Sequence, residues 1–92
     1  LNTVLTVYTL KTNVKIYVPT NLDETKSRTV FEAKHSNVMA TLFWHIDNEF
    51  VGETKELHYM KLNPTVGRHT LTIVDEDGES ITRDFEIMAG ED

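Results

Sequence analysis

The chain has 92 residues, of which 39% are hydrophobic and 26% charged, with a net charge of −6 and no cysteine. This composition is typical of a folded domain rather than a disordered segment, and the length predicts a single domain, residues 1–92, without room for a deep catalytic cleft. The acidic charge argues against a nucleic-acid ligand, and the lack of cysteine excludes disulfides, thiol nucleophiles and cysteine-ligated zinc.

Short runs of alternating apolar residues open the chain, and no segment holds helical spacing for two turns. We expect the first strands over residues 3–10, 14–18 and 28–34. The first run is interrupted by threonine, has no basic cluster and falls far short of the ~20 residues that span a bilayer. The sequence therefore predicts neither a signal peptide nor an anchor here, and no membrane contact by this chain.

A hairpin built around the single tryptophan comes next. Three large apolar residues alternate with their neighbours and so share one face: Leu42, Trp44 and Ile46. Asp47–Asn48 then supplies two residues that tolerate positive φ in a tight turn, and Gly52 in the returning strand is typical of a β-bulge. The pattern predicts that the indole faces the core.

The second half of the chain repeats the hairpin pattern. We expect a strand over Leu57–Leu62, a sharp turn over Asn63–Gly67, and a long hairpin in which His69–Val74 and Ile81–Ile87 flank Asp77–Gly78. Arg83 is in phase with the apolar residues of the last strand. Either the strand leaves the core there, or the stem of Arg83 lies on apolar surface with its guanidinium in water.

About seven short strands with turns roughly every 8 to 12 residues predict an all-β fold, an immunoglobulin-like β-sandwich. Alternation also predicts which side chains form its core. These are Phe31, Leu42, Trp44, Ile46, Leu71, Ile73 and Phe85.

Catalytic chemistry has little support in the sequence. No serine is followed by lysine three residues on or set in a Gly-x-Ser-x-Gly elbow, so we expect no catalytic residue. The four histidines lie on different predicted strands without a close sequence pair, so we expect no metal site and no cofactor. They are His35, His45, His58 and His69. Asp75–Glu79 has part of the pattern of a calcium loop, but we interpret it as a solvated hairpin turn.

Aromatic side chains offer a different kind of site. Phe43 and His45 face away from the side of Trp44, and we expect Tyr59 to lie near them. Flat rings on a sheet can stack on sugars or on partner side chains. Phe43, His45 and Tyr59 are therefore candidate binding residues.

Five segments, in this order, resemble the C-terminal domain of penicillin-binding protein 1C. They are Val30–Ala33, Thr41–Asp47, Val51–Thr54 with His58, Pro64–Gly78 and Arg83–Ile87. The resemblance covers the chain from about Ile16 onward. It is strongest in the tryptophan hairpin and in the Gly-x-His-x-Leu hairpin that follows Pro64.

The resemblance implies an accessory domain of a bacterial peptidoglycan synthase whose glycosyltransferase and transpeptidase domains work on the periplasmic side of the inner membrane. The nucleophilic serine of such an enzyme would lie upstream, so no catalytic residue is carried over. The implied partners are the enzyme's own transpeptidase domain, peptidoglycan or envelope proteins. Two alternatives stay open: a carbohydrate-binding module that uses exposed aromatics, and a purely structural spacer.

Overall fold

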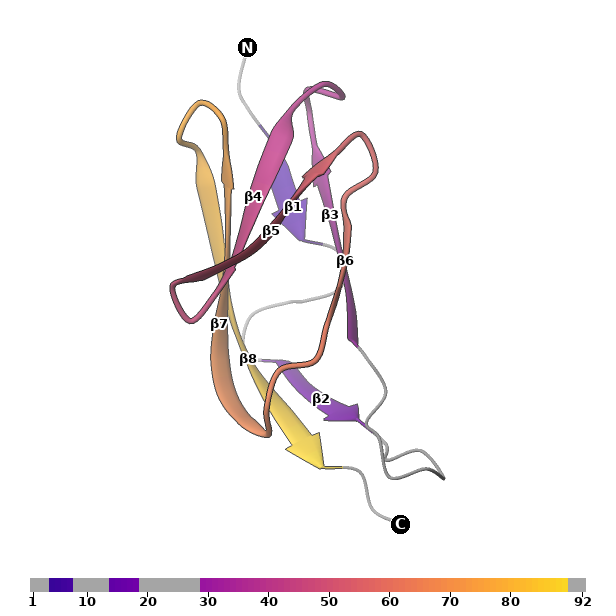
Figure 1. Cartoon of the computed structure of the whole chain (residues 1–92), viewed down its shortest axis with the longest axis vertical. Coiled ribbons are helices and arrows are strands. Elements are labelled where there is room, and N and C mark those ends of the chain that lie inside the picture. The colour runs from indigo at the N-terminus through magenta and orange to yellow at the C-terminus, as the bar shows by residue number, and fades with distance from the viewer. Residues whose placement is uncertain (1–3, 8–13, 19–28, 90–92) are drawn as a thin grey trace.

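The computed structural model describes residues 4–7, 14–18 and 29–89, and every regular element in these ranges is a β-strand (Figure 1). The strands are β1 (Leu5–Val7), β2 (Val14–Val18), β3 (Thr29–His35), β4 (Thr41–Ile46), β5 (Glu49–Lys55), β6 (Tyr59–Leu62), β7 (Gly67–Asp75) and β8 (Ser80–Ala89). No helix in these ranges is long and apolar enough to cross a bilayer. Of the expected strands, residues 3, 8–10 and 28 lie outside the described part.

The strands form two facing sheets. One has the order β1-β3-β6 and the other the order β2-β8-β7-β4-β5. All neighbours are antiparallel except β2, which runs parallel to β8. The first two strands therefore belong to opposite sheets. This arrangement confirms the predicted all-β, immunoglobulin-like sandwich, with eight strands where about seven were expected.

The tryptophan hairpin has the turn and the bulge that its sequence predicts. Asp47–Asn48 turns the chain with φ values of 51° and 69°, a conformation that Asp and Asn tolerate better than most residues. The pairing of β4 with β5 shifts between Trp44 and His45. Trp44 thus pairs with Gly52, where an added Cβ would lie 3.0 Å from the Cε of Met60. Glycine leaves room there for a side chain of the opposite sheet.

The core lies between the two sheets. Its buried residues are Val7, Val18, Phe31, Ala33, Leu42, Trp44, Leu71, Ile73, Phe85 and Ile87. Phe31 of one sheet packs on Phe85 of the other with ring centroids 5.4 Å apart. Ile46, at the turn end of β4, is only partly buried against this cluster. Arg83 stays within β8, half-buried, and its guanidinium donates a hydrogen bond to the Thr82 carbonyl (3.0 Å).

Candidate functional site

Aromatic side chains gather on the outer face of the five-stranded sheet, at the β4–β5 edge. Phe43 and His45 are half-buried there, on the face of β4 opposite Trp44. The ring of Phe50 packs edge-on against that of His45, with centroids 5.7 Å apart and an interplanar angle of 65°. Phe50 is 59% exposed, and the Nδ1 atom of His45 is buried without a hydrogen-bond partner. We call Phe43, His45 and Phe50 the aromatic face.

Tyr59 lies elsewhere, because the chain crosses to the other sheet between β5 and β6. It pairs with Glu32 of β3 and faces away from the core, on the opposite side of the sandwich from the aromatic face. A hydrogen bond to Glu32, followed by the charge of that carboxylate, raises the pKa of Tyr59. The structure brings Phe43 and His45 together, but not Tyr59 with them.

Phe50 was missed in the sequence, although the turn and not the bulge determines its side. His45 pairs with Phe50 and Trp44 with Gly52, so Val51 is the extra residue of β5. Gly52 signals a bulge but does not tell which residue is left unpaired. The tight turn at Asp47–Asn48 was the available clue, since a two-residue turn sets Ile46 opposite Glu49 and hence His45 opposite Phe50.

A buried chain of hydrogen bonds links the tryptophan to a histidine. The indole N–H of Trp44 donates to the Thr54 hydroxyl (2.8 Å), which in turn contacts Nδ1 of His58 (2.7 Å). The hydroxyl oxygen accepts from the indole and can donate its own proton to Nδ1 of a neutral His58. Desolvation by burial, then the charges of His35 and Lys34, lower the pKa of His58.

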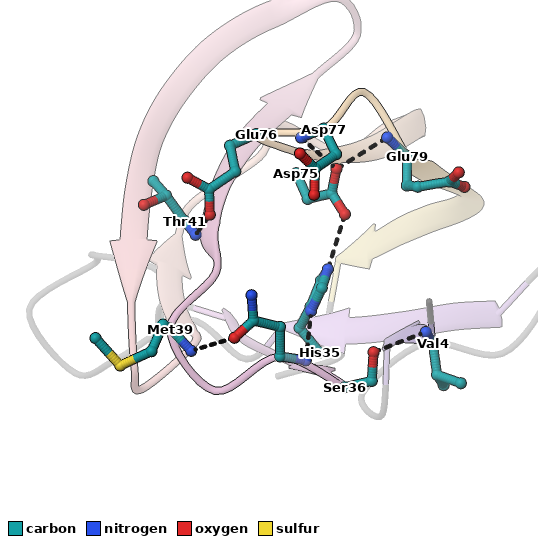
Figure 2. Close-up of polar contacts among 10 residues, drawn as sticks. Val4, His35, Ser36, Met39, Thr41, Asp75, Glu76, Asp77 and Glu79 are labelled. Atoms are coloured by element: carbon teal, nitrogen blue, oxygen red, sulfur yellow. Dashed lines mark hydrogen bonds and ion pairs between the residues drawn. The ribbon is translucent and has the colours of Figure 1, made fainter. Parts of the chain in front are cut away.

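The carboxylate of Asp75 fastens the β3–β4 connection to the β7–β8 turn (Figure 2). One oxygen accepts from Nε2 of His35 (2.8 Å), and the other accepts from the backbone N–H groups of Asp77 and Glu79 (2.9 Å each). Burial alone would raise the pKa of Asp75, but the hydrogen bonds from His35, Glu79 and Asp77 outweigh it and lower that pKa. The acidic turn is therefore anchored by one buried carboxylate.

A third histidine joins two turns at the other end of the sandwich. Nδ1 of His69 contacts the Asp47 carboxylate (2.6 Å), and Nε2 contacts the Thr65 carbonyl (2.6 Å). Both partners can only accept, so the protonated imidazolium satisfies both contacts. Desolvation lowers the pKa of His69, but the hydrogen bonds to Asp47 and Thr65 outweigh it and raise that pKa. The hydrogen bond from His69 is the main reason that the pKa of Asp47 is lowered.

These networks hold strands together and offer little to a substrate. Thr54 and His58 have the spacing of a hydroxyl and its base, yet Thr54 also accepts from the fully buried Trp44 and His58 is only 5% exposed.

Within the described ranges no group of three or more His, Asp or Glu could hold a metal ion. An open groove of about 540 Å³ lies beside β2, β7 and β8 and is lined by charges of both signs, among them Lys15, Arg68 and Glu86.

The fold defines the class of this protein: a small β-sandwich of the fibronectin(III)-like and immunoglobulin-like type. Solved structures of Clostridium thermocellum CbhA fibronectin(III)-like modules superpose on it with a TM-score of 0.68 at 13% identity, covering 96% of this chain and 100% of that one. An identity this low supports the fold alone.

The sequence matches the Penicillin-Binding Protein C-terminus Family over residues 2–87, and the chain belongs to that family. No curated protein matches it significantly.

Proposed function

We propose that the chain is a non-catalytic accessory module of a penicillin-binding protein that acts in peptidoglycan synthesis on the periplasmic side of the bacterial inner membrane. It positions the enzyme or binds a partner through its surface. Family membership over residues 2–87 supports the placement in such a protein, and the immunoglobulin-like fold suits an accessory role.

One observation carries the non-catalytic part of this proposal. Three of the four histidines, side chains with the chemistry of general bases, are tied to neighbouring strands and turns: His35 to Asp75, His58 to Thr54, and His69 to Asp47. A general base must reach the proton that it removes from a substrate. These histidines instead hold the sandwich together, which favours action by contact.

The test uses the parent penicillin-binding protein with and without this module, together with the isolated 92-residue chain. We expect the isolated chain to show no turnover of peptidoglycan precursors or stem peptides. We expect the truncated parent to keep its acylation by penicillin while its yield of polymerised or cross-linked product changes. Turnover by the isolated chain that survives control substitutions would disprove the proposal, as would a truncated parent that behaves like the intact one.

A second candidate function is carbohydrate binding by the aromatic face. It is supported by the exposure of Phe50 and by the unpartnered Nδ1 of His45, which leaves a polar atom beside two rings. Rings of this kind stack on the apolar faces of sugars. Titration with muropeptides would then give saturable chemical-shift changes at Phe43, His45 and Phe50, and Phe50→Ala would abolish them. Tyr17→Ala, at an exposed aromatic on β2 of the same sheet, is the matched control.

A purely structural spacer is distinguished by the same two experiments. A spacer would bind no sugar, and its removal would lower the melting temperature or yield of the parent protein without changing the specific activity of the remaining domains. A changed specific activity supports a positioning role instead.

A further inference from the structure

One end of the sandwich displays the most exposed large apolar side chains of the described residues. Leu57, Val38 and Met39 are 74%, 73% and 71% exposed. Val38 and Met39 precede β4 and Leu57 follows β5. Because Thr41 pairs with Lys55, the β3–β4 and β5–β6 connections that carry these residues lie at the same end of the sheet (Figure 1). We call Val38, Met39 and Leu57 the apolar end. Apolar groups gathered in this way are typical of an interaction surface.

The loop that carries two of these residues is held in one conformation. The side-chain oxygen of Asn37 accepts from the Met39 N–H (2.9 Å), and the Asn37 carbonyl accepts from the Ala40 N–H (3.0 Å). The Asn37 N–H donates to Nδ1 of His35 (2.9 Å), whose Nε2 is bonded to the buried Asp75. A loop already ordered loses little conformational entropy when it binds, so its apolar side chains are preorganised for a partner.

The chain also enters the sandwich at this end. The N–H of Val4 donates to the hydroxyl of Ser36 (3.0 Å), and the Ser36 N–H donates to the Val4 carbonyl (2.8 Å). Ser36 belongs to the same connection as Val38 and Met39, and Figure 2 shows Ser36 and Met39 on it. Val4, which is 56% exposed, therefore lies beside the connection that carries two residues of the apolar end.

Negative charge borders the apolar end. Glu76, Asp77 and Glu79 are exposed on the β7–β8 turn, and one carboxylate oxygen of Glu76 accepts from the N–H of Thr41 at the start of β4 (3.2 Å, Figure 2). This turn itself contains no cation, but Lys55, which pairs with Thr41, is exposed at the same end and is followed by the exposed Glu56. Such a border attracts basic side chains and opposes approach to an anionic lipid surface.

We propose that the apolar end docks onto the domain that precedes this module in the parent penicillin-binding protein, at an apolar patch edged by basic side chains. The inference rests on the proposed function, since the family description places the module at the C-terminus of such a protein. The docked domain would then lie beside the contact between Val4 and Ser36. Contacts between neighbouring domains of one chain are commonly of this mixed apolar and polar kind.

Hydroxyl-radical footprinting tests this docking on the intact parent protein and on the isolated 92-residue chain. We expect oxidation of Met39 and Leu57 to be several-fold lower in the parent than in the isolated chain. Tyr17, which is 66% exposed on β2, serves as the internal control and should react equally in both. Equal reactivity of Met39 in the two proteins would overturn the proposal, and so would protection that arises only when phosphatidylglycerol vesicles are added.

A pair of variants separates docking from local folding. In the parent carrying Val38→Ser and Met39→Ser, oxidation of Leu57 should rise to the level of the isolated chain. The matched control is Val66→Ser, at a 49% exposed valine between β6 and β7, which should leave Leu57 protected. Both variants should leave the melting temperature of the isolated chain nearly unchanged. Protection of Leu57 that persists in the double variant contradicts docking through these side chains.

The two proposals can fail independently. If removal of the module alters the parent enzyme while Met39 stays fully reactive in the intact protein, the accessory role stands and docking through the apolar end is wrong. If removal of the module has no effect on the parent, the accessory role itself is wrong.

Discussion

Replacing Thr54 with valine removes the hydroxyl that joins Trp44 to His58 while keeping nearly the same volume. The indole N–H and Nδ1 of His58 then lose their shared partner in surroundings where Trp44 is 0% and His58 5% exposed. Leaving each buried polar group unpaired costs roughly 1–3 kcal/mol, so we expect Thr54→Val to lower the free energy of unfolding by about 3 kcal/mol. In a domain of this size that corresponds to a fall of ~12–24 °C in melting temperature.

Thr54→Ser is the matched control, because it keeps the hydroxyl and loses only a methyl group, at a cost of about 1 kcal/mol. Urea unfolding of the isolated chain, followed by the fluorescence of its single tryptophan, measures the free energy of unfolding of both variants against that of the unmutated chain. We expect the valine variant to be less stable than the serine variant by about 2 kcal/mol, the difference between these two costs. Equal stability of the two variants would refute the hydrogen-bonded chain as a stabilising element.

Three other predictions concern the same framework. Gly52→Ala should destabilise the fold by roughly 1–3 kcal/mol in urea unfolding, because φ is 155° and the added Cβ would lie 3.0 Å from Met60 Cε; unchanged stability would contradict the tight packing. Because the pKa of His69 is raised, the contribution of His69 to the stability of the fold is fully present below pH 6.5 and is lost as the pH rises through the folded-state pKa. His69→Gln should remove this contribution to the pH dependence of the melting temperature in a series of melting curves. Asp75→Asn should cost roughly 2–4 kcal/mol by loss of the contact with His35, and should also reduce the loss of stability below pH 3.8, to which the lowered pKa of Asp75 contributes.

Local features of the fold could be predicted from the sequence because neighbouring residues determine them. Alternation placed Leu42 and Trp44 on the inner face of β4, and residues tolerant of positive φ marked its turn at Asp47–Asn48. The bulge near Gly52 was predicted for the same local reason. The parallel pairing of β2 with β8 was not, since it joins segments from opposite ends of the chain and depends on how the whole sandwich closes.

The candidate site could be predicted only in part. Phe43 and His45 follow from the same alternation, whereas Phe50 follows from the cross-strand register that the two-residue turn sets. Tyr59 was expected near them because it comes soon after the hairpin, but sequence proximity does not tell which sheet the next strand joins. His58 is buried and contacts Thr54, and the alternation of apolar residues predicts neither.

Three of the four histidines tie strands and turns of the sandwich together: His35, His58 and His69. The most direct test is an NMR titration of the histidine ring nitrogens in the isolated chain. We expect His58 to have a pKa below 6.5 and to carry its proton on Nε2 when neutral. We expect His69 to have a pKa above 6.5 and therefore to be doubly protonated at pH 6.5. If both rings instead titrate together near pH 6.5, like histidines free in solvent, the networks that join the strands are absent and the account is wrong.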